Sequence, residues 1–424
     1  MRLSFKYDVS KISNVQKEII NDIMWHTTKV YNILLHELRE KEKQININKS
    51  INIISSPIYK EYRQNNWHSE YLHSHTLQQV IINVVQNYKS YLKSIEEYKK
   101  NKTKFKGEPR EPRYKGVNIQ EIIITKYGVR KEKNILKLSL SKKMQEKYKV
   151  KSLNFSIPYE LKKLVNFKSI KMIRITKRGE KIEMNIVYDK KEKAKSKYEN
   201  IMSIDLGLNN IVACTNRDNN DSLLVSGKEA KSKNKYILNE ISKLQRINKL
   251  SKENKNKKHV PNTKRINKLY EYRRNYMNTY MHKVSKMVIE YAKKNKCSKI
   301  VIGDLKDIKQ GMKYNTNFVQ VPIQILTQKI EYKAKLEGIE VKKISEKYTS
   351  GVSAIDKEEI TKENYKKKRR ISRGIFETNN GKKINADING SLNILRKYIK
   401  ISNPNLEIAM DNGREQRPIK KRVA

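Results

Sequence analysis

The chain has 424 residues, with 94 lysines and arginines against 44 aspartates and glutamates, which gives a formal net charge of +50. This excess of cations predicts a polyanionic partner, because a basic surface that binds phosphates releases counterions condensed on nucleic acid. No apolar stretch reaches the ~18 residues needed to span a membrane and no signal peptide is visible, so we expect a cytoplasmic protein without a membrane partner. Cys214 and Cys297 lie in or beside apolar runs, which predicts core thiols rather than a disulfide or a metal site.

The first hundred residues are predicted to be mainly helical. Residues 2–8 have the pattern of a short strand, residues 14–44 that of a long amphipathic helix, and residues 67–100 that of a further helical region. This last region contains His68, His73 and His75. Because no carboxylate or cysteine accompanies them at matching spacing, we interpret them as polar residues at a helix start rather than as metal ligands.

Residues 105–115 form a basic segment rigidified by two prolines, with Arg110, Arg113 and Lys115 around Tyr114. Cations and an aromatic ring on a rigid backbone suit phosphate contacts and base stacking, whereas an ordinary linker is the alternative. Residues 117–190 then contain several short β-prone runs separated by charged or glycine-containing turns. They predict an antiparallel β-domain, which we expect to form a small barrel together with the strand at residues 2–8.

The apolar run 201–204 ends on a lone carboxylate, Asp205, and a Gly207 turn leads into a second apolar run, 211–213. This pattern predicts a β-hairpin with Asp205 at the end of a buried strand. A carboxylate there is costly unless it meets a cation, and hard oxygen ligands suit Mg²⁺ or Mn²⁺. For this stretch alone, a turn-capping aspartate is the alternative.

A long basic helical hairpin is predicted over about 229–295, after a strand near 223–225. Cations recur on both arms and acids are few, so we expect RNA or duplex contacts through Arg265, Arg273 and Arg274; a solvated helix face is the alternative. The remaining expected elements are a buried strand at 298–303, a helix at 321–337, a strand at 339–344 and a last helix with Asp387 near its positive N-terminus.

Asp205 in Ile-Asp-Leu-Gly and Asp387 in Asn-Ala-Asp-Ile-Asn-Gly form the signature pair of a RuvC-type, RNase H-like nuclease that is split by insertions. With this pair the chain resembles TnpB, a family of transposon-encoded RNA-guided DNA endonucleases. The resemblance implies an α/β multi-domain fold with a RuvC core, helical insertions, an N-terminal helical lobe and an antiparallel β-barrel wedge domain. The implied domains are a wedge over 1–9 and 105–198, a recognition lobe over 10–104, a nuclease over 199–400 with insertions at 229–295 and 347–384, and a basic tail over 401–424.

The resemblance also implies a function. The protein would bind a guide RNA, recognise a short motif in double-stranded target DNA beside the complementary sequence, and cleave that DNA. Two-metal hydrolysis needs several carboxylates around Mg²⁺ or Mn²⁺, and Asp205 and Asp387 would bridge the metals. We expect a monomer that acts on the nucleoid of a prokaryotic cytoplasm.

The third carboxylate departs from the family pattern. In most TnpB proteins a glutamate precedes Asp-Leu at the end of the 298–303 strand, but here that position is Gly303. Asp304 is a poor substitute, because side-chain alternation points it to the opposite face. Glu346 follows the strand expected beside Gly303, at a strand spacing of ~4.8 Å, and we predict that it is the third catalytic and metal-binding residue. The alternatives are a nuclease-dead, RNA-guided repressor and a DNA-binding protein without RNA.

The family's zinc ribbon is also missing. Residues 347–384 contain no cysteine and no histidine, so we expect no zinc. A basic run with Arg369, Arg370 and Arg373, followed by an Asn379-Asn380-Gly381 turn, predicts a metal-free hairpin that contacts target nucleic acid through phosphates. A flexible basic loop is the alternative.

Overall fold

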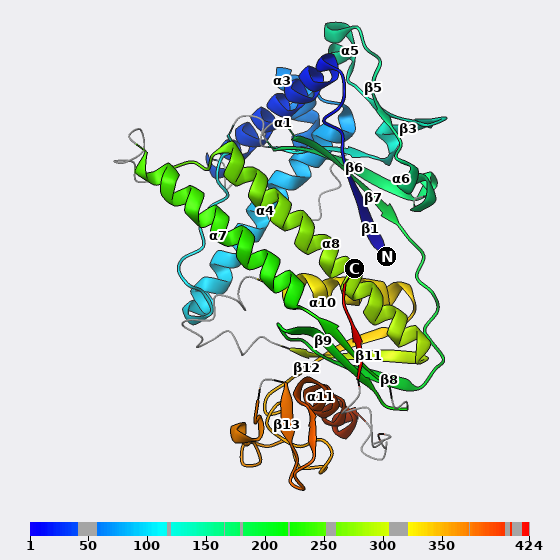
Figure 1. The fold of residues 1–424 in the computed structure, drawn as a ribbon. Coiled ribbons are helices and arrows are strands. Elements are labelled where there is room, and N and C mark those ends of the chain that lie inside the picture. Colours follow the sequence, from blue (N-terminus) through cyan, green and yellow to red (C-terminus); the bar gives the residue numbers. More distant parts are fainter. Residues whose placement is uncertain are drawn as a thin grey trace. The chain divides into compact units, whose positions relative to one another are not determined.

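The computed structural model divides the chain into two compact units, residues 1–190 and residues 191–424 (Figure 1). The residues that it describes are 1–40, 57–116, 120–164, 166–178, 181–218, 221–251, 260–304, 321–372, 374–402, 408 and 418–423. Predictions made for positions 41–44, 117–119 and Arg373, and for much of the tail, therefore lie outside the described residues.

Seven strands of the N-terminal unit form two antiparallel sheets. The first has the order β1-β7-β6-β2, with β1 (Arg2–Asp8), β7 (Lys181–Asp189), β6 (Ile170–Arg178) and β2 (Ile122–Thr125). The second contains β3 (Val129–Glu132), β4 (Ile135–Ser139) and β5 (Ser152–Ser156). The N-terminal strand does join the later strands, as expected, but the described strands form two open sheets rather than the expected barrel. Each sheet has too few strands to close on itself.

The helices of this unit are α1 (Asn14–Glu40), α2 (Pro57–Asn65), α3 (Trp67–Glu70), α4 (Ser74–Lys100), α5 (Lys142–Tyr148) and α6 (Tyr159–Leu164). The helical region expected over 67–100 is divided into α3 and α4 because each begins at its own cap. Asn66 accepts the His68 backbone N–H at 3.0 Å, and His73 Nδ1 accepts the His75 backbone N–H at 3.4 Å. His68 and His73 thus both lie at helix starts, and His68 is also buried, with its Nδ1 3.0 Å from His26 Nδ1.

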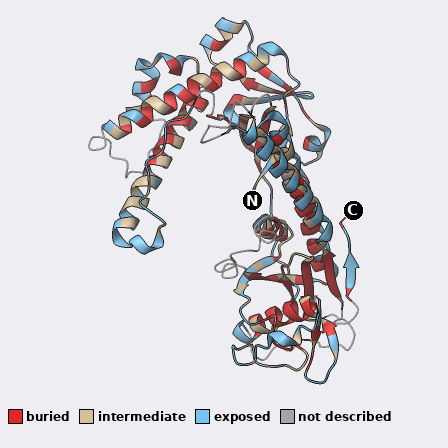
Figure 2. Cartoon of the chain, turned by 60° about the vertical axis from the view of Figure 1, so that its left-hand side comes forward, coloured by how far each residue is buried: buried red, intermediate tan, exposed pale blue. Residues whose placement is uncertain are grey.

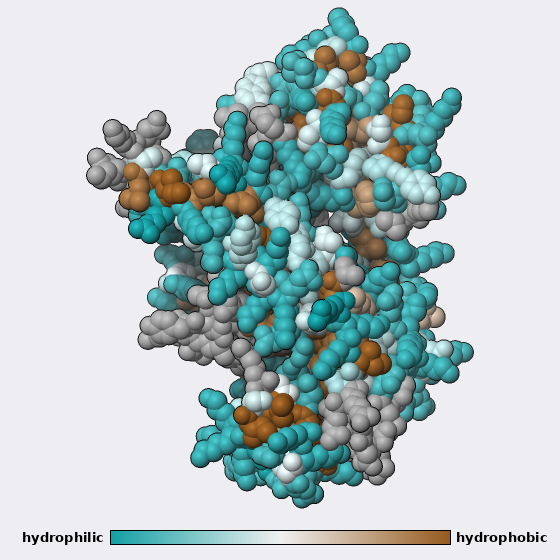
Figure 3. All heavy atoms as spheres, in the orientation of Figure 1, coloured by the Kyte–Doolittle hydropathy of each residue, from teal (hydrophilic) through white to brown (hydrophobic). Residues whose placement is uncertain are grey.

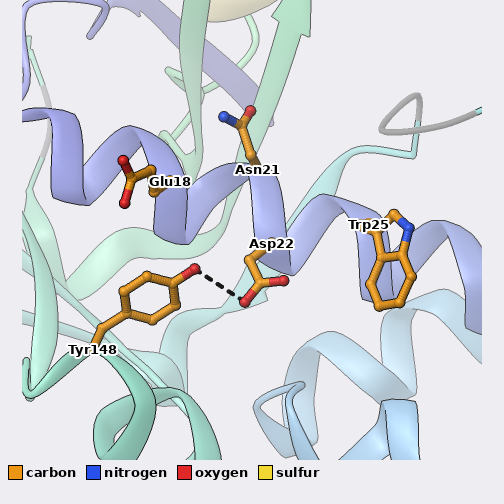
Figure 4. A pocket seen from close by; sticks show the side chains of 5 residues that line it. All are labelled: Glu18, Asn21, Asp22, Trp25 and Tyr148. Atoms are coloured by element: carbon orange, nitrogen blue, oxygen red, sulfur yellow. Dashed lines mark hydrogen bonds between the residues drawn. The ribbon is translucent and has the colours of Figure 1, made fainter.

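A shallow pocket on the N-terminal unit is lined by Glu18, Asn21, Asp22 and Trp25 of α1 and by Tyr148 of α5 (Figure 4). The Asp22 carboxylate accepts the Tyr148 hydroxyl at 3.1 Å and the Lys147 ammonium at 2.7 Å. These bonds join α1 to α5, so the carboxylate at the centre of the pocket already has a cationic partner.

The C-terminal unit is built on a six-stranded sheet with the order β12-β11-β8-β9-β10-β15. Its strands are β8 (Asn200–Asp205), β9 (Asn210–Asn216), β10 (Ser222–Ser226), β11 (Cys297–Asp304), β12 (Glu340–Ser345) and β15 (Ile419–Lys421). β8, β11 and β12 are parallel to one another, and β9 is antiparallel to β8, as the expected hairpin requires. The basic tail contains β15, which pairs parallel with β10.

Helices cover both faces of this sheet (Figure 1). On one face, Met202, Ile204, Ile300 and Ile302 pack against α8 (Lys264–Lys294) and α10 (Ile323–Leu336). On the other face, Ile201 and Val301 pack against α11 (Ala386–Ser402). Side chains point alternately to the two faces along each strand. Because helices cover both faces, the central strands are buried on both sides (Figure 2).

The helical hairpin expected over 229–295 corresponds to α7 (Lys228–Leu250) and α8. The displayed surface is mostly hydrophilic, with apolar atoms gathered at the outer end of α7, where Ile247 and Leu250 are exposed (Figure 3). Among the described helices, none has the length and apolar character that crossing a bilayer requires.

Candidate functional site

Asp205 ends β8 on the face of the sheet that α11 covers. The preceding residues of β8 are buried, and alternation places Asp205 on the same side as Ile201 and Ser203. Ser203 Oγ donates to the Ser391 carbonyl of α11 at 2.7 Å. The helix is therefore fastened to β8 close to Asp205.

Asp387 lies in the first turn of α11, where the helix dipole favours a negative charge. The helix starts here because Asn385 Oδ1 accepts the backbone N–H groups of Asp387 and Ile388 at 3.0 and 3.1 Å. The Asp387 carboxylate itself accepts a hydrogen bond from Asn210 Nδ2 at 2.8 Å and forms an ion pair with Arg370 at 3.2 Å.

Gly390 allows α11 to approach Asp205 closely. A Cβ atom on residue 390 would lie 2.6 Å from Asp205 Oδ2, closer than real Cβ contacts come. Burial, and then the Asp387 charge, raise the pKa of Asp205 to about 7, while the Arg370 charge opposes this rise. The two carboxylates singled out near opposite ends of the C-terminal unit are therefore neighbours in the structure.

Glu346 lies directly after β12 and fills the space above Gly303. The parallel register pairs Gly303 with Ile344, and alternation turns Glu346 to the same face as Ile344. A Cβ atom on residue 303 would lie 2.6 Å from Glu346 Oε2 and 2.9 Å from Ile394 Cδ1. The side chain that this position carries in most TnpB proteins would thus collide with Glu346.

The Glu346 carboxyl is held in an environment that disfavours its charge. Burial, followed by the charges of Asp205 and Asp304, raises the pKa of Glu346 to about 8. Its Oε2 atom is buried without a hydrogen-bond partner among the described residues. A buried carboxyl oxygen without a hydrogen-bond partner is costly, and a cation bound by it would offset that cost.

The carboxylate oxygens of Asp205, Asp387 and Glu346 are the donors that Mg²⁺ and Mn²⁺ prefer. Their mutual repulsion and the unpartnered Oε2 are features that a divalent cation would relieve, so the residues fit such an ion. Within the described parts of the chain, however, no three histidine, cysteine, aspartate or glutamate side chains converge closely enough to form a ready ligand cluster. The carboxylates are coupled by their charges without forming a closed ligand shell.

Glu358 organises the insertion at 347–384 through hydrogen bonds and an ion pair. Its carboxylate accepts the Ser353 backbone N–H at 2.9 Å, Arg369 at 2.6 Å and Asn379 Nδ2 at 2.8 Å. These bonds and the Arg369 charge outweigh burial and lower the pKa of Glu358 to about 2. The expected hairpin is present as β13 (Ile375–Glu377) paired antiparallel with β14 (Lys383–Asn385).

Two asparagines of α11 bind the insertion to the sheet unit. Asn389 Nδ2 and Asn393 Nδ2 donate to the Val352 carbonyl at 2.8 and 2.7 Å, and Asn389 Oδ1 accepts the Ala354 N–H at 2.9 Å. Asn389 and Asn393 were not singled out as anchors from the sequence. The sequence feature that could have indicated this role is that these two amide side chains stand among the apolar residues of the last helix.

The described residues that were predicted to bind nucleic acid fall into two groups, the exposed ones and those with partners inside the protein. Arg110, Arg113, Arg265 and Arg274 are exposed and available to phosphates. Arg373 lies outside the described residues.

The remaining cations of that set have partners within the protein. Lys115 lies over the Tyr31 ring at 4.4 Å, and burial lowers its pKa. Arg273 Nε donates to Asn234 at 2.7 Å. Arg369 and Arg370 contact carboxylates, as described above, so each of these four has a structural contact besides any role on nucleic acid.

Comparison with known proteins matches two family models. Residues 185–309 match OrfB_IS605, described as a probable transposase, and residues 324–394 match the Cas12f1-like TNB domain. No curated protein sequence matches the chain.

Solved structures with a similar fold include that of a Cas12f1–sgRNA–target DNA complex, with a TM-score of 0.61, 17% identity, and coverage of 89% of this chain and 82% of that chain. The mini-RNA-guided endonuclease CRISPR-Cas_phi3 has a TM-score of 0.48 and 12% identity, over 93% of this chain and 92% of that chain. The first of these likenesses shows a shared multi-domain α/β fold. The two family matches, taken with this fold, agree with the resemblance of the chain to the TnpB family.

Proposed function

We propose that this protein is an RNA-guided DNA endonuclease that cleaves with divalent cations at a RuvC-type, RNase H-like core. The observation that carries the proposal is the position of Glu346, whose carboxylate occupies the space above Gly303 and is coupled by charge to Asp205. With Asp387 at the start of α11, this supports three carboxylates on one face of the sheet, as metal-dependent phosphodiester hydrolysis needs.

The chain's own residues have distinct roles in this proposal. Asp205, Asp387 and Glu346 would hold Mg²⁺ or Mn²⁺, which when bound activates water and stabilises the leaving oxygen of a phosphodiester. Asn210 fixes one oxygen of Asp387 by its 2.8 Å hydrogen bond, and Gly390 leaves room for the Asp205 carboxylate. The sheet and α11 thus orient the acids from rigid elements.

A guide RNA and a double-stranded DNA target are the proposed partners. The net charge of +50 and the exposed Arg110, Arg113, Arg265 and Arg274 support binding to phosphate backbones. The similar Cas12f1 structure is that of a complex with an sgRNA and target DNA. Binding should weaken with a slope of log K against log salt of about −0.9 per phosphate contact on duplex DNA.

The alternative is a guided repressor that binds DNA without cutting it. Gly303 and the absence of a closed ligand cluster among the described residues favour this alternative.

The proposal is tested by co-expressing the protein with its native flanking DNA, purifying it with its RNA, and incubating it with a plasmid library and Mg²⁺. The proposed function predicts cleavage beside a short motif, and loss of that cleavage in Asp205→Ala with target binding retained. Target binding without cleavage by the wild type would support the repressor, and purification without RNA would contradict both.

A further inference from the structure

Both oxygens of Asp387 are occupied by donors from the protein itself. Asn210 Nδ2 donates to Oδ2 at 2.8 Å, and Arg370 donates to Oδ1 at 3.2 Å. An amide is neutral and can remain beside a bound cation, but a guanidinium carries a positive charge that repels one. The Arg370 contact and a divalent cation therefore compete for the same carboxylate.

Arg370 contacts Asp387, and the residue before it, Arg369, is held in place by contacts within the insertion. Arg369 is only 13% exposed and is held by Glu358 and Asn379, whereas the Arg370 side chain is 42% exposed. The anchored arginine fixes the backbone, and the exposed one can leave its carboxylate by side-chain rotation. The hydrogen bonds centred on Glu358 thus hold the segment from which the partly exposed Arg370 side chain reaches Asp387.

We propose that Arg370 is the resident counterion of this site: its guanidinium holds Asp387 until a divalent cation binds, and must then release the carboxylate. This inference rests on the proposed metal-dependent function. The displaced guanidinium has the planar donor geometry that matches a phosphate, so the nucleic acid backbone is the anion that would receive it. Nucleic acid binding and cation binding would then favour each other, because each removes Arg370 from Asp387.

The size of the effect follows from the exposure of the pair. Partly exposed ion pairs of this kind contribute modest free energies, which correspond to about a twofold to fivefold change in affinity. Arg370→Gln should therefore tighten divalent-cation binding by about twofold to fivefold in the absence of nucleic acid. The same variant should cleave more slowly at saturating cation, because the phosphate loses its guanidinium.

The test is a Mn²⁺ titration of the full chain, freed of nucleic acid at high salt, followed by electron paramagnetic resonance. Wild type, Arg370→Gln, Lys368→Gln and Asp387→Asn are compared, and binding lost in Asp387→Asn defines the site. Lys368 is an exposed cation two residues away, so Lys368→Gln removes the same charge without removing the Asp387 contact. Thermal unfolding of each variant shows that its fold is intact.

The proposal predicts tighter Asp387-dependent Mn²⁺ binding in Arg370→Gln and wild-type affinity in Lys368→Gln. Equal affinity of wild type and Arg370→Gln, or an equal gain in both glutamine variants, would overturn the role of Arg370 and leave the proposed function standing. Absence of Asp387-dependent Mn²⁺ binding in every variant would contradict the proposed metal site as well.

Discussion

Glu346 Oε2 lies 2.6 Å from the position that a Cβ atom on Gly303 would occupy. A side chain at residue 303 and the observed position of the Glu346 carboxyl therefore exclude each other. Gly303 in β11 and Glu346 after β12 therefore depend on each other: the Glu346 carboxyl group lies in the space that a side chain on residue 303 would occupy.

This exclusion predicts that returning a glutamate to position 303 is harmful unless Glu346 is removed. Gly303→Glu alone should lose cleavage and destabilise the protein by about 1–3 kcal/mol, the range for overpacking a buried site. The double variant Gly303→Glu/Glu346→Gly should recover stability and part of the activity, as measured by urea unfolding and guided plasmid cleavage. Full activity of the single variant would contradict the arrangement.

Gly390→Ala should separate activity from stability. The new methyl group would lie 2.6 Å from Asp205 Oδ2 and displace that carboxylate, and displacements near 1 Å can cost about a hundredfold in rate. The variant's helix should not be weakened by the substitution itself, because alanine is favoured over glycine in helices by about 1 kcal/mol.

The matched control for Gly390→Ala is Ser391→Ala, which removes a buried hydroxyl bonded to Ser203 and Thr215 but leaves the space beside Asp205 open. It should lose about 1 kcal/mol of stability and keep most of the cleavage rate. The reverse pattern in the two variants would show that Gly390 does not position Asp205.

Glu346→Gln should stabilise the metal-free protein increasingly as the pH rises. The folded pKa of about 8 exceeds the ordinary value of 4.5, so between these values the folded state binds a proton that the unfolded state lacks. Wild-type stability therefore falls with rising pH over this window, and the glutamine variant lacks this loss. Thermal unfolding at pH 5 and pH 8 without divalent cations measures the difference, and added Mg²⁺ should stabilise only the wild type. If the stability of wild type and that of Glu346→Gln changed equally with pH, the result would contradict the burial of this carboxyl group.

Glu358→Gln should show the opposite pH dependence. The folded pKa of about 2 lies below the ordinary value of 4.5, so the stabilisation is present above about pH 4.5 and is lost as the pH falls toward 2. The variant should lose about 1.5–3 kcal/mol at neutral pH, the range for hydrogen bonds to a charged group, and the loss should shrink below pH 4.5.

Proteolysis of the insertion provides a local readout for Glu358. Cleavage within residues 347–384 should be faster in Glu358→Gln, and a chelator should leave the wild-type rate unchanged because the described contacts here are hydrogen bonds and ion pairs. A chelator-sensitive insertion would indicate a metal in place of the network centred on Glu358.

The sequence was sufficient to locate the elements that carry Asp205, Glu346 and Asp387. The runs before Asp205 and Gly303 are short and almost continuously apolar, as in strands buried on both faces, and parallel pairing of β11 with β12 follows from the chain order expected for this fold. The position of Glu346 could be inferred because Gly303 leaves a gap on the adjacent strand. These predictions depended on strand register, which alternation fixes tightly in a buried sheet.

Other features could not be derived from local pattern. The division of the N-terminal strands into two sheets depends on pairings between distant segments, and α5 and α6 are too short to give a clear periodicity. The hydrogen bond from Asn210 to Asp387 joins residues far apart in the sequence, and the bonds of Glu358 lie in an insertion with little regular secondary structure. Lys115 has the setting of a phosphate-binding residue, yet its packing on Tyr31 is decided by the tertiary structure.

The most direct measurement is the guided cleavage rate of wild type and Glu346→Gln, each bound to the same RNA and matched target, over a range of Mg²⁺ concentrations. The account predicts Mg²⁺-dependent cleavage by wild type and a rate reduced by at least about a hundredfold in the variant, with equal target binding. Cleavage by Glu346→Gln at the wild-type rate, or no cleavage by the wild type despite bound RNA and target, would contradict it.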